Sequence, residues 1–211
     1  MNKEEFIIEV QKLGINLSEE QLEKLDKFYQ ILIEENQKIN LTRITDEKEV
    51  YLKHFYDSLT LVKVVNFNKI ETLCDVGSGA GFPGIVLKIV FPHLKVTLID
   101  SLLKRVNYLN ETIKKLELDN IKAIHTRSED YSETFDIVTS RAVANISKLL
   151  TFTMHLVNKN GICAAMKGNI DQELTPEVME QINRKYQIVN IEKFKLPIEE
   201  SNRTIIVLKN K

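Results

Sequence analysis

Thr72-Leu-Cys-Asp-Val-Gly-Ser-Gly-Ala-Gly-Phe-Pro-Gly84 is the stretch that decides the fold. Its apolar start predicts a strand, and glycines follow at positions 77, 79, 81 and 84. Pro83 precedes an apolar segment and suits the first position of a helix, where its missing N–H would have no partner. A strand, a glycine-rich turn and a helix are the usual start of a nucleotide-binding α/β domain.

The bulk composition is that of an ordinary globular protein. The chain has 211 residues, 43% of them apolar and 28% charged, and a net charge of −1, so there is no overall electrostatic attraction to nucleic acid. Neither a membrane span nor a secretory signal is apparent, and we expect a cytoplasmic monomer with no membrane partner. Cys74 and Cys163 are expected to be buried free thiols. The histidines have no spacing typical of a metal site, so no metal is expected.

Residues 1–66 show helical patterns and no strand pattern. Ser18-Glu-Glu-Gln21 is a capping box ahead of an apolar face at helical spacing. A loop is expected over Lys38–Arg43, and Asp46 is expected to cap a third helix. We therefore predict an N-terminal helical cap, residues 1–66, packed as one unit with a second domain, residues 67–211.

The second domain alternates predicted strands and helices. Five strands are predicted to be parallel, and they cover 72–76, 95–99, 121–125, 135–139 and 162–166. The helices between them cover 83–90, 102–116 and 145–157, with a short turn at 128–131. Two further strands, 187–196 and 203–209, predict an antiparallel hairpin. This pattern is typical of the Rossmann-like, class I fold of AdoMet-dependent methyltransferases, a mostly parallel seven-stranded sheet ending in an antiparallel hairpin.

The residues of the glycine turn leave three alternatives for its ligand: a dinucleotide, AdoMet or no ligand. Gly79-Ala-Gly-Phe-Pro-Gly84, with Asp100 further on, matches the dinucleotide fingerprint, and an NAD-binding oxidoreductase is one alternative. Asp75 argues for AdoMet, because a carboxylate suits the ammonium end of a methionine moiety better than a pyrophosphate. Gly77 extends the glycine run upstream in the form seen in methyltransferases, and the terminal hairpin points the same way. A turn with no ligand is the plainest alternative.

Asp100 is expected at the end of the second strand. Its two carboxylate oxygens could accept both ribose hydroxyls, or it could cap the following helix, or do both. Lys104 and Arg105 lie in the first turn of that helix, either on a solvated face or in contact with an anion.

Seven blocks of sequence resemble the glucose-inhibited division protein B family, also called ribosomal RNA small subunit methyltransferase G. They are Asn36-Gln-Lys-Ile-Asn-Leu-Thr42, His54-Phe-Tyr-Asp-Ser-Leu59, Asp75-Val-Gly-Ser-Gly-Ala-Gly-Phe-Pro-Gly84, Asp100-Ser-Leu-Leu-Lys-Arg105, Arg127-Ser-Glu129, Ser140-Arg-Ala142 and Lys167-Gly168. They follow the family's order over almost the whole chain.

The resemblance implies transfer of a methyl group from S-adenosyl-L-methionine (AdoMet) to N7 of a guanosine in the 530 loop of 16S ribosomal RNA. Together with the residue-based reasoning, it gives an expected cofactor site of Asp75, Gly77, Gly79, Phe82, Asp100, Ser128, Glu129 and Arg141. Phe82 and the Ser128-Glu129 segment are expected to flank the adenine.

Guanine N7 carries a free lone pair, so no general base is required and catalysis is mainly positioning. Arg141 and Lys167 follow predicted strands and are candidates to donate to guanine O6. His54 and Asp57 share a helix face, as a surface pair or near the cofactor. RNA contact is expected from these two candidates and from Lys38, Arg43, Lys104, Arg105 and Arg127. An AdoMet methyltransferase with a small-molecule or protein acceptor, or a non-catalytic RNA-binding protein, are further alternatives.

Overall fold

A computed structural model of the chain describes residues 1–141 and 144–211. One seven-stranded sheet runs in the order β3-β2-β1-β4-β5-β7-β6. The strands are β1 (Thr72–Val76), β2 (Lys95–Asp100), β3 (Ile121–His125), β4 (Phe135–Arg141), β5 (Val157–Lys167), β6 (Tyr186–Lys195) and β7 (Asn202–Asn210). The first five are parallel, and β7 pairs antiparallel with both β5 and β6. The predicted sheet with its terminal hairpin is confirmed.

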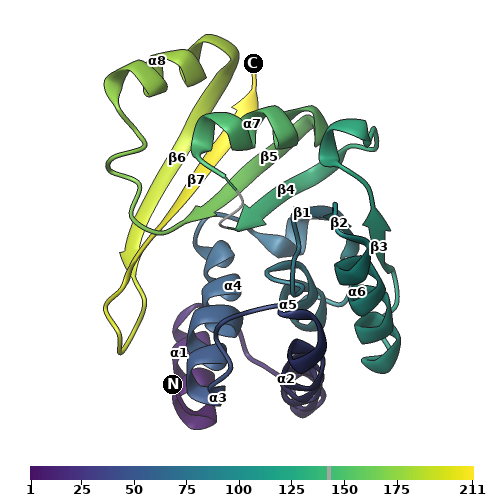
Figure 1. Cartoon of the computed structure of the whole chain (residues 1–211). Coiled ribbons are helices and arrows are strands. Elements are labelled where there is room, and N and C mark those ends of the chain that lie inside the picture. The colour runs from purple at the N-terminus through teal and green to yellow at the C-terminus, as the bar shows by residue number, and fades with distance from the viewer. Residues whose placement is uncertain (142–143) are drawn as a thin grey trace.

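Helices cover both faces of the sheet (Figure 1). One face carries α5 (Gly84–Val90) and α6 (Leu103–Lys115), and the other carries α7 (Ile146–Thr153) and α8 (Pro176–Lys185). The strands serve both cores because successive side chains point to opposite faces. In β1, Leu73 belongs to the α5–α6 core, whereas Cys74 belongs to the α7–α8 core. Both predicted free thiols, Cys74 and Cys163, are buried.

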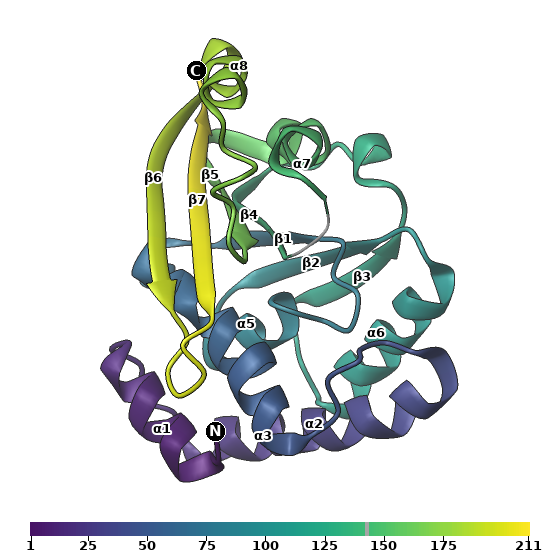
Figure 2. The ribbon, with the colours of Figure 1, turned by 60° about the vertical axis from the view of Figure 1, so that its left-hand side comes forward.

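The helices before β1 form a further layer beneath α5 and α6 (Figure 2). They are α1 (Lys3–Lys12), α2 (Glu19–Ile39), α3 (Glu47–Val50), the π-helical turn η1 (Tyr51–Tyr56), α4 (Asp57–Leu59) and the 3-10 turns η2 (Thr60–Lys63) and η3 (Phe67–Lys69). The predicted capping box at Ser18 and the cap at Asp46 are both present. One hydrophobic cluster joins these helices to the sheet through residues such as Phe28, Phe55 and Leu73. The predicted division between residues 66 and 67 stays a prediction.

Several boundaries differ from the predictions. Helix α2 continues to Ile39, and Asn40 ends it in the left-handed conformation, so the loop begins two residues later than predicted. The predicted helix 145–157 ends earlier, because the 3-10 turn η5 (Met154–Leu156) leads directly into β5. The short turn near residue 128 is the 3-10 turn η4 (Ser128–Asp130). Helix α8 was not predicted, although Thr175 caps it and Pro176 begins it, a pairing typical of helix starts.

No helix of the described residues is long and apolar enough to cross a membrane. Ala142, the last residue of one family-like block, lies outside the described residues.

Candidate functional site

The glycine turn between β1 and α5 has a conformation that favours glycine. Gly77, Gly79 and Gly81 have φ values of 73°, 56° and 98°, a region that side chains with a Cβ rarely enter. The Gly77 N–H donates to the Ile99 carbonyl of β2 at 2.8 Å, which fixes the start of the turn beside the next strand. Gly84 allows α5 to approach β1, because a Cβ there would lie 2.8 Å from Asp75 Oδ2.

A cavity of about 630 Å³ opens at the carboxyl ends of β1, β2, β3 and β4. Ligands of open α/β sheets bind at this edge, and the volume lies within the roughly 300–1,000 Å³ of small-molecule sites. Five of the predicted cofactor residues line it, namely Gly77, Asp100, Ser128, Glu129 and Arg141. We call this the turn cavity.

Asp100 supports the turn as well as lining the cavity. Its Oδ2 accepts from the Gly79 N–H at 3.0 Å, and its Oδ1 accepts from the Leu102 N–H at 2.9 Å, just before α6. Arg105 lies 3.5 Å from the same carboxylate. Asp100 does not cap α6, because the N-cap residue is Leu102 and no side chain caps this helix; the carboxylate instead fixes the turn that leads into it. Each oxygen still has lone-pair capacity for a ligand hydroxyl.

Asp75 is fully buried behind the turn and does not line the cavity. Its Oδ2 accepts from the Gly84 N–H at 2.9 Å, whereas its Oδ1 has no hydrogen-bond partner among the described residues. Burial raises the pKa of this carboxyl to about 7, against the opposing effects of the Gly84 hydrogen bond and the Arg141 charge. The predicted contact with the methionine end of a ligand stays a prediction.

The Phe82 side chain packs among other aromatic rings. The ring packs against the N-terminal helices, stacked on His54 at a centroid distance of 4.4 Å and 5.2 Å from the Phe28 ring. It is not among the residues that line the turn cavity. The helical layer covers the ring, and its expected contact with an adenine stays a prediction.

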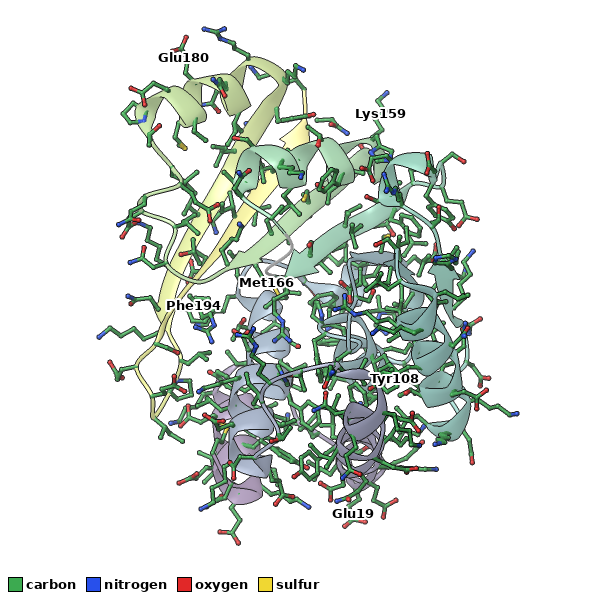
Figure 3. The ribbon with its side chains drawn as sticks, viewed as in Figure 1. Glu19, Tyr108, Lys159, Met166, Glu180 and Phe194 are labelled. Atoms are coloured by element: carbon green, nitrogen blue, oxygen red, sulfur yellow. The ribbon has the colours of Figure 1, made fainter. Side chains whose placement is uncertain are left out.

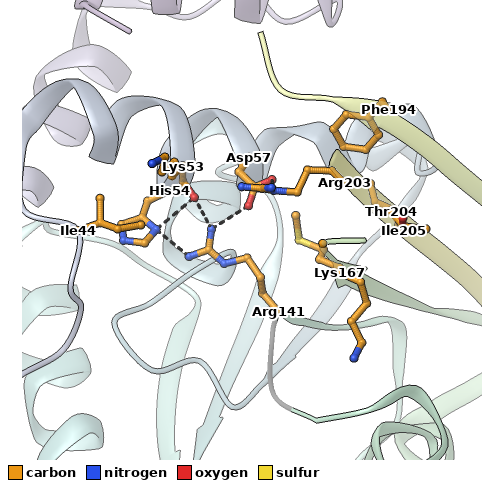
Figure 4. A pocket seen from close by; sticks show the side chains of 12 residues that line it. Ile44, Lys53, His54, Asp57, Arg141, Lys167, Phe194, Arg203, Thr204 and Ile205 are labelled. Atoms are coloured by element: carbon orange, nitrogen blue, oxygen red, sulfur yellow. Dashed lines mark hydrogen bonds and ion pairs between the residues drawn. The ribbon is translucent and has the colours of Figure 1, made fainter. Parts of the chain in front are cut away.

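Arg141, at the end of β4, is held by the N-terminal helices (Figure 4). Its guanidinium donates to the Lys53 carbonyl at 2.9 Å, to His54 Nδ1 at 3.0 Å and to Asp57 Oδ2 at 3.2 Å. It also lies 5.1 Å from the Phe82 ring centroid, a cation–π distance. Burial lowers the pKa of Arg141, and the Asp57 carboxylate opposes that change.

His54 and Asp57 are buried, so the interpretation as a surface pair is wrong. Arginine only donates, so the bond from Arg141 assigns His54 Nδ1 as the acceptor and Nε2 as the donor to Thr42 Oγ1 at 3.0 Å; the Lys53 carbonyl, 3.2 Å from Nδ1, then receives no hydrogen bond from the ring. Burial and the Arg141 charge lower the pKa of His54 to about 3, which keeps the ring neutral.

Asp57 joins Arg141 to a second arginine, which the sequence analysis missed. Arg203 Nε, at the start of β7, donates to Asp57 Oδ1 at 2.9 Å. The two residues are 146 positions apart, and no local motif marks Arg203.

A second cavity, of about 280 Å³, lies between η1 and β7 (Figure 4). Ile44, Met166, Phe194 and Ile205 provide apolar walls, and its polar lining includes Asp57, Arg141, Lys167 and Arg203. Figure 3 shows Met166 and Phe194 at the end of the sheet nearest the N-terminal helices. We call this the cap cavity, and Arg141 lines it as well as the turn cavity.

The Lys167 side chain is held by hydrogen bonds within the protein. Its ammonium is buried and donates to the Ala144 carbonyl and to both carboxylate oxygens of Glu173, at 3.3 Å from Oε1 and 3.0 Å from Oε2. Three donors of this ammonium are thus engaged within the protein. The geometry gives no support to its predicted contact with guanine O6.

The predicted RNA-binding cations are spread over the surface. Arg105 and Arg127 line the turn cavity. Lys38, Arg43 and Lys104 are exposed, line neither cavity, and Lys38 pairs with Glu34 and Glu35. RNA contact by these residues stays a prediction.

The sheet order, the terminal hairpin and a cavity at the glycine turn define the class I methyltransferase fold. Solved structures with this fold include a SAM-dependent methyltransferase from Aquifex aeolicus, with a TM-score of 0.53 and 18% identity over 77% of this chain and 93% of that one. Another is MtNAS in complex with MTA and tNA, with a TM-score of 0.60 and 16% identity over 88% of this chain and 74% of that one.

The chain belongs to the rRNA small subunit methyltransferase G family, whose sequence pattern matches residues 21–206. The relative named Ribosomal RNA small subunit methyltransferase G in Bacillus subtilis is 47% identical over 99% of this chain and 90% of its own length. The relative of the same name in Oceanobacillus iheyensis is 46% identical over 100% of this chain and 92% of its own. The predicted family and fold class are confirmed.

Proposed function

We propose that this protein transfers a methyl group from AdoMet to N7 of a guanosine in the 530 loop of 16S ribosomal RNA. The observation that carries the proposal is the match to relatives named for small-subunit rRNA methylation over 99% or more of the chain. The guanosine and its N7 atom come from the family resemblance.

The residues around the turn cavity fit AdoMet. Asp100, Ser128 and Glu129 line the cavity, and the carboxylate oxygens of Asp100 are suitable acceptors for ribose hydroxyls. Asp75 is buried behind the cavity and its Oδ1 lacks a partner among the described residues, so in this proposal the ionised carboxylate accepts from the ammonium end through a bridging water. When bound, AdoMet supplies an electrophilic methyl group on a positively charged sulfur.

The chain's own contribution is orientation and exclusion of water. Guanine N7 needs no base, and the described residues around Arg141 contain no nucleophile–base pair: His54 is neutral and bonded to Arg141 and Thr42. Asp57 compensates part of the positive charge that Arg141 and Arg203 bring to the cap cavity, whose wall towards the turn cavity Arg141 forms. That compensation limits repulsion of a cationic donor and of the cation that methylated guanine becomes.

The experiment is methylation of small-subunit RNA in vitro, with the modified position mapped by chemical cleavage at N7-methylguanosine. Cells with and without the gene provide the second arm. We expect methyl transfer to one guanosine of the 530 loop, lost when the gene is deleted and restored by the wild-type gene. An unmodified 530 loop in both arms, with AdoMet binding intact by calorimetry, would favour a small-molecule or protein acceptor.

A further inference from the structure

We propose that the cap cavity binds the acceptor guanine base and that Arg203 donates a hydrogen bond to guanine O6. The inference rests on the proposed function and deepens it, because it names the site and the residue that recognise the methyl acceptor. The two cavities share a wall, which Arg141 forms.

The cap cavity is placed where an acceptor has to lie. Arg141 lines both cavities, so the cap cavity is the immediate neighbour of the turn cavity. Met166, Lys167 and Gly168 place it at the end of β5, beside β4 in the sheet. A base in this cavity can therefore present an edge towards the ligand at the end of β1 without crossing the sheet.

The size and lining suit one flat, amphipathic ring system. A volume of about 280 Å³ lies just below the roughly 300–1,000 Å³ range of ligand sites, so it suits one base better than several nucleotides. Phe194 and Met166 offer apolar surface for the ring faces, and aromatic contact with an unpaired base is a usual mode of RNA recognition. The charged side chains around them offer hydrogen bonds to its edge.

The lone pair of guanine N7 must stay free for methyl transfer, so the residue that orients the base has to donate its hydrogen bond to O6 and not to N7. Three cations other than Arg141 line the cavity. The Lys53 ammonium pairs with Glu49 and Glu199, and the Lys167 ammonium pairs with Glu173. These two lysines are therefore held away from a new partner.

Arg203 is held and still has a donor to offer. Its Nε donates to Asp57 Oδ1, and its Nη1 donates to Ser201 Oγ at 3.3 Å and to the Asn202 carbonyl at 2.9 Å. Its Nη2 makes no hydrogen bond to any residue that the structure describes. A guanidinium fixed on two of its nitrogens presents the third at little further cost in conformational freedom. Phe194 is the cross-strand neighbour of Arg203, so the ring and the donor belong to the same rigid hairpin.

The test combines a protein variant with a change of one atom group in the RNA. The substrate is a 530-loop RNA with guanosine or with 2-aminopurine riboside at the target, because 2-aminopurine keeps N7 and lacks O6. We expect wild-type kcat/KM to fall roughly 10- to 100-fold with 2-aminopurine, the range for loss of a hydrogen bond from a charged donor. In Arg203→Met the guanosine rate falls similarly and the penalty for 2-aminopurine disappears.

Arg184→Met is the matched control, because Arg184 is exposed on α8 and pairs only with Glu180 among the described residues. It should keep the wild-type discrimination, and calorimetric AdoMet binding should be the same in all three proteins. Arg203→Met that still discriminates like wild type would overturn the assignment of Arg203.

A second measurement uses the wild-type protein and does not depend on the variant folding. RNA with 6-thioguanosine at the target carries a photoreactive sulfur in place of O6. Irradiation should cross-link it to the β6–β7 hairpin near Phe194 and Arg203, as mapped by mass spectrometry. A cross-link confined to another part of the chain would overturn the base site. A wild-type protein that methylates no guanosine in this RNA would instead count against the proposed function.

Discussion

Asp57→Asn should destabilise the protein far more than an ordinary Asp-to-Asn change. The Asp57 side chain is 5% exposed and accepts from Arg141 and Arg203, whose side chains are 16% and 22% exposed. Removing one partner of a buried ion pair costs roughly 3–5 kcal/mol, because the remaining charge is left uncompensated. Both guanidiniums reach some solvent, so we expect the lower end, about 3 kcal/mol. For a chain of this size, that corresponds to a fall in Tm of about 6–12 °C.

Urea unfolding at 25 °C, followed by circular dichroism, measures the free energy of unfolding, and calorimetry gives Tm. Asp171→Asn is the matched control, because Asp171 pairs with Lys193 and both side chains are more than half exposed. It should cost less than about 1 kcal/mol. A double-mutant cycle with Arg141→Met then isolates the coupling of Asp57 to Arg141. If the costs of Asp57→Asn and Asp171→Asn agree within error, the reasoning about the buried network is refuted.

Three further changes probe the turn and its surroundings. Gly84→Ala should lower the free energy of unfolding by about 1–3 kcal/mol, because the added Cβ would clash with Leu98 and Asp75, whereas the control Gly168→Ala has open space around it and should not. Equal urea midpoints for the two variants would contradict this prediction. His54→Gln should reduce the loss of stability as the pH falls from 6.5 to 5, because the folded-state pKa of His54 is lowered to about 3 and only the unfolded chain binds a proton there in that window. An unchanged slope of unfolding free energy against pH would contradict this prediction. Asp75→Asn should have the opposite effect, because the folded-state pKa of Asp75 is raised to about 7 and the folded protein holds the extra proton between pH 4 and pH 7, so wild type loses stability as the pH rises through that window. The variant should lose less stability than wild type over this range, and a slope equal to that of wild type would show that the carboxyl is not protonated.

Short local sequence patterns predict most of the strands and helices of this fold. The strand predictions at 72–76 and 121–125 match β1 and β3. The first is a short apolar run and is buried, whereas the second contains Lys122 and His125 and is a partly exposed strand at the edge of the sheet.

Helix α8 was overlooked although Val178 and Ile182 lie four positions apart and pack on the same core, which is the spacing of a helix face. Thr175 before Pro176 adds the usual start of a helix, so both the cap and the apolar face of α8 are present in the sequence.

The candidate site was predictable where it depends on one turn and unpredictable where distant segments meet. Gly77 and Asp100 are near the glycine motif, and their positions follow from strand and turn geometry. The Asp57–Arg203 pair joins segments 146 residues apart, and neither residue has a sequence signal pointing to the other. The contact of Phe82 with the adenine was expected from the family resemblance, whereas no sequence signal pointed to the aromatic rings of the N-terminal helices that pack against it.

The helices before β1 therefore belong to the site. Without them, Arg141 would lose the Lys53 carbonyl, the His54 ring and the Asp57 carboxylate, and its side chain would be free to leave the wall between the cavities. The π-helical turn η1 contributes Lys53 and His54 and leads directly into Asp57, and such irregular turns are frequent at functional sites. The sheet provides the edge at which ligands collect, and the N-terminal helices fix the arginine that divides that edge into two cavities. The class I fold accounts for the turn cavity, whereas the second cavity exists only because these helices pack beside the terminal hairpin.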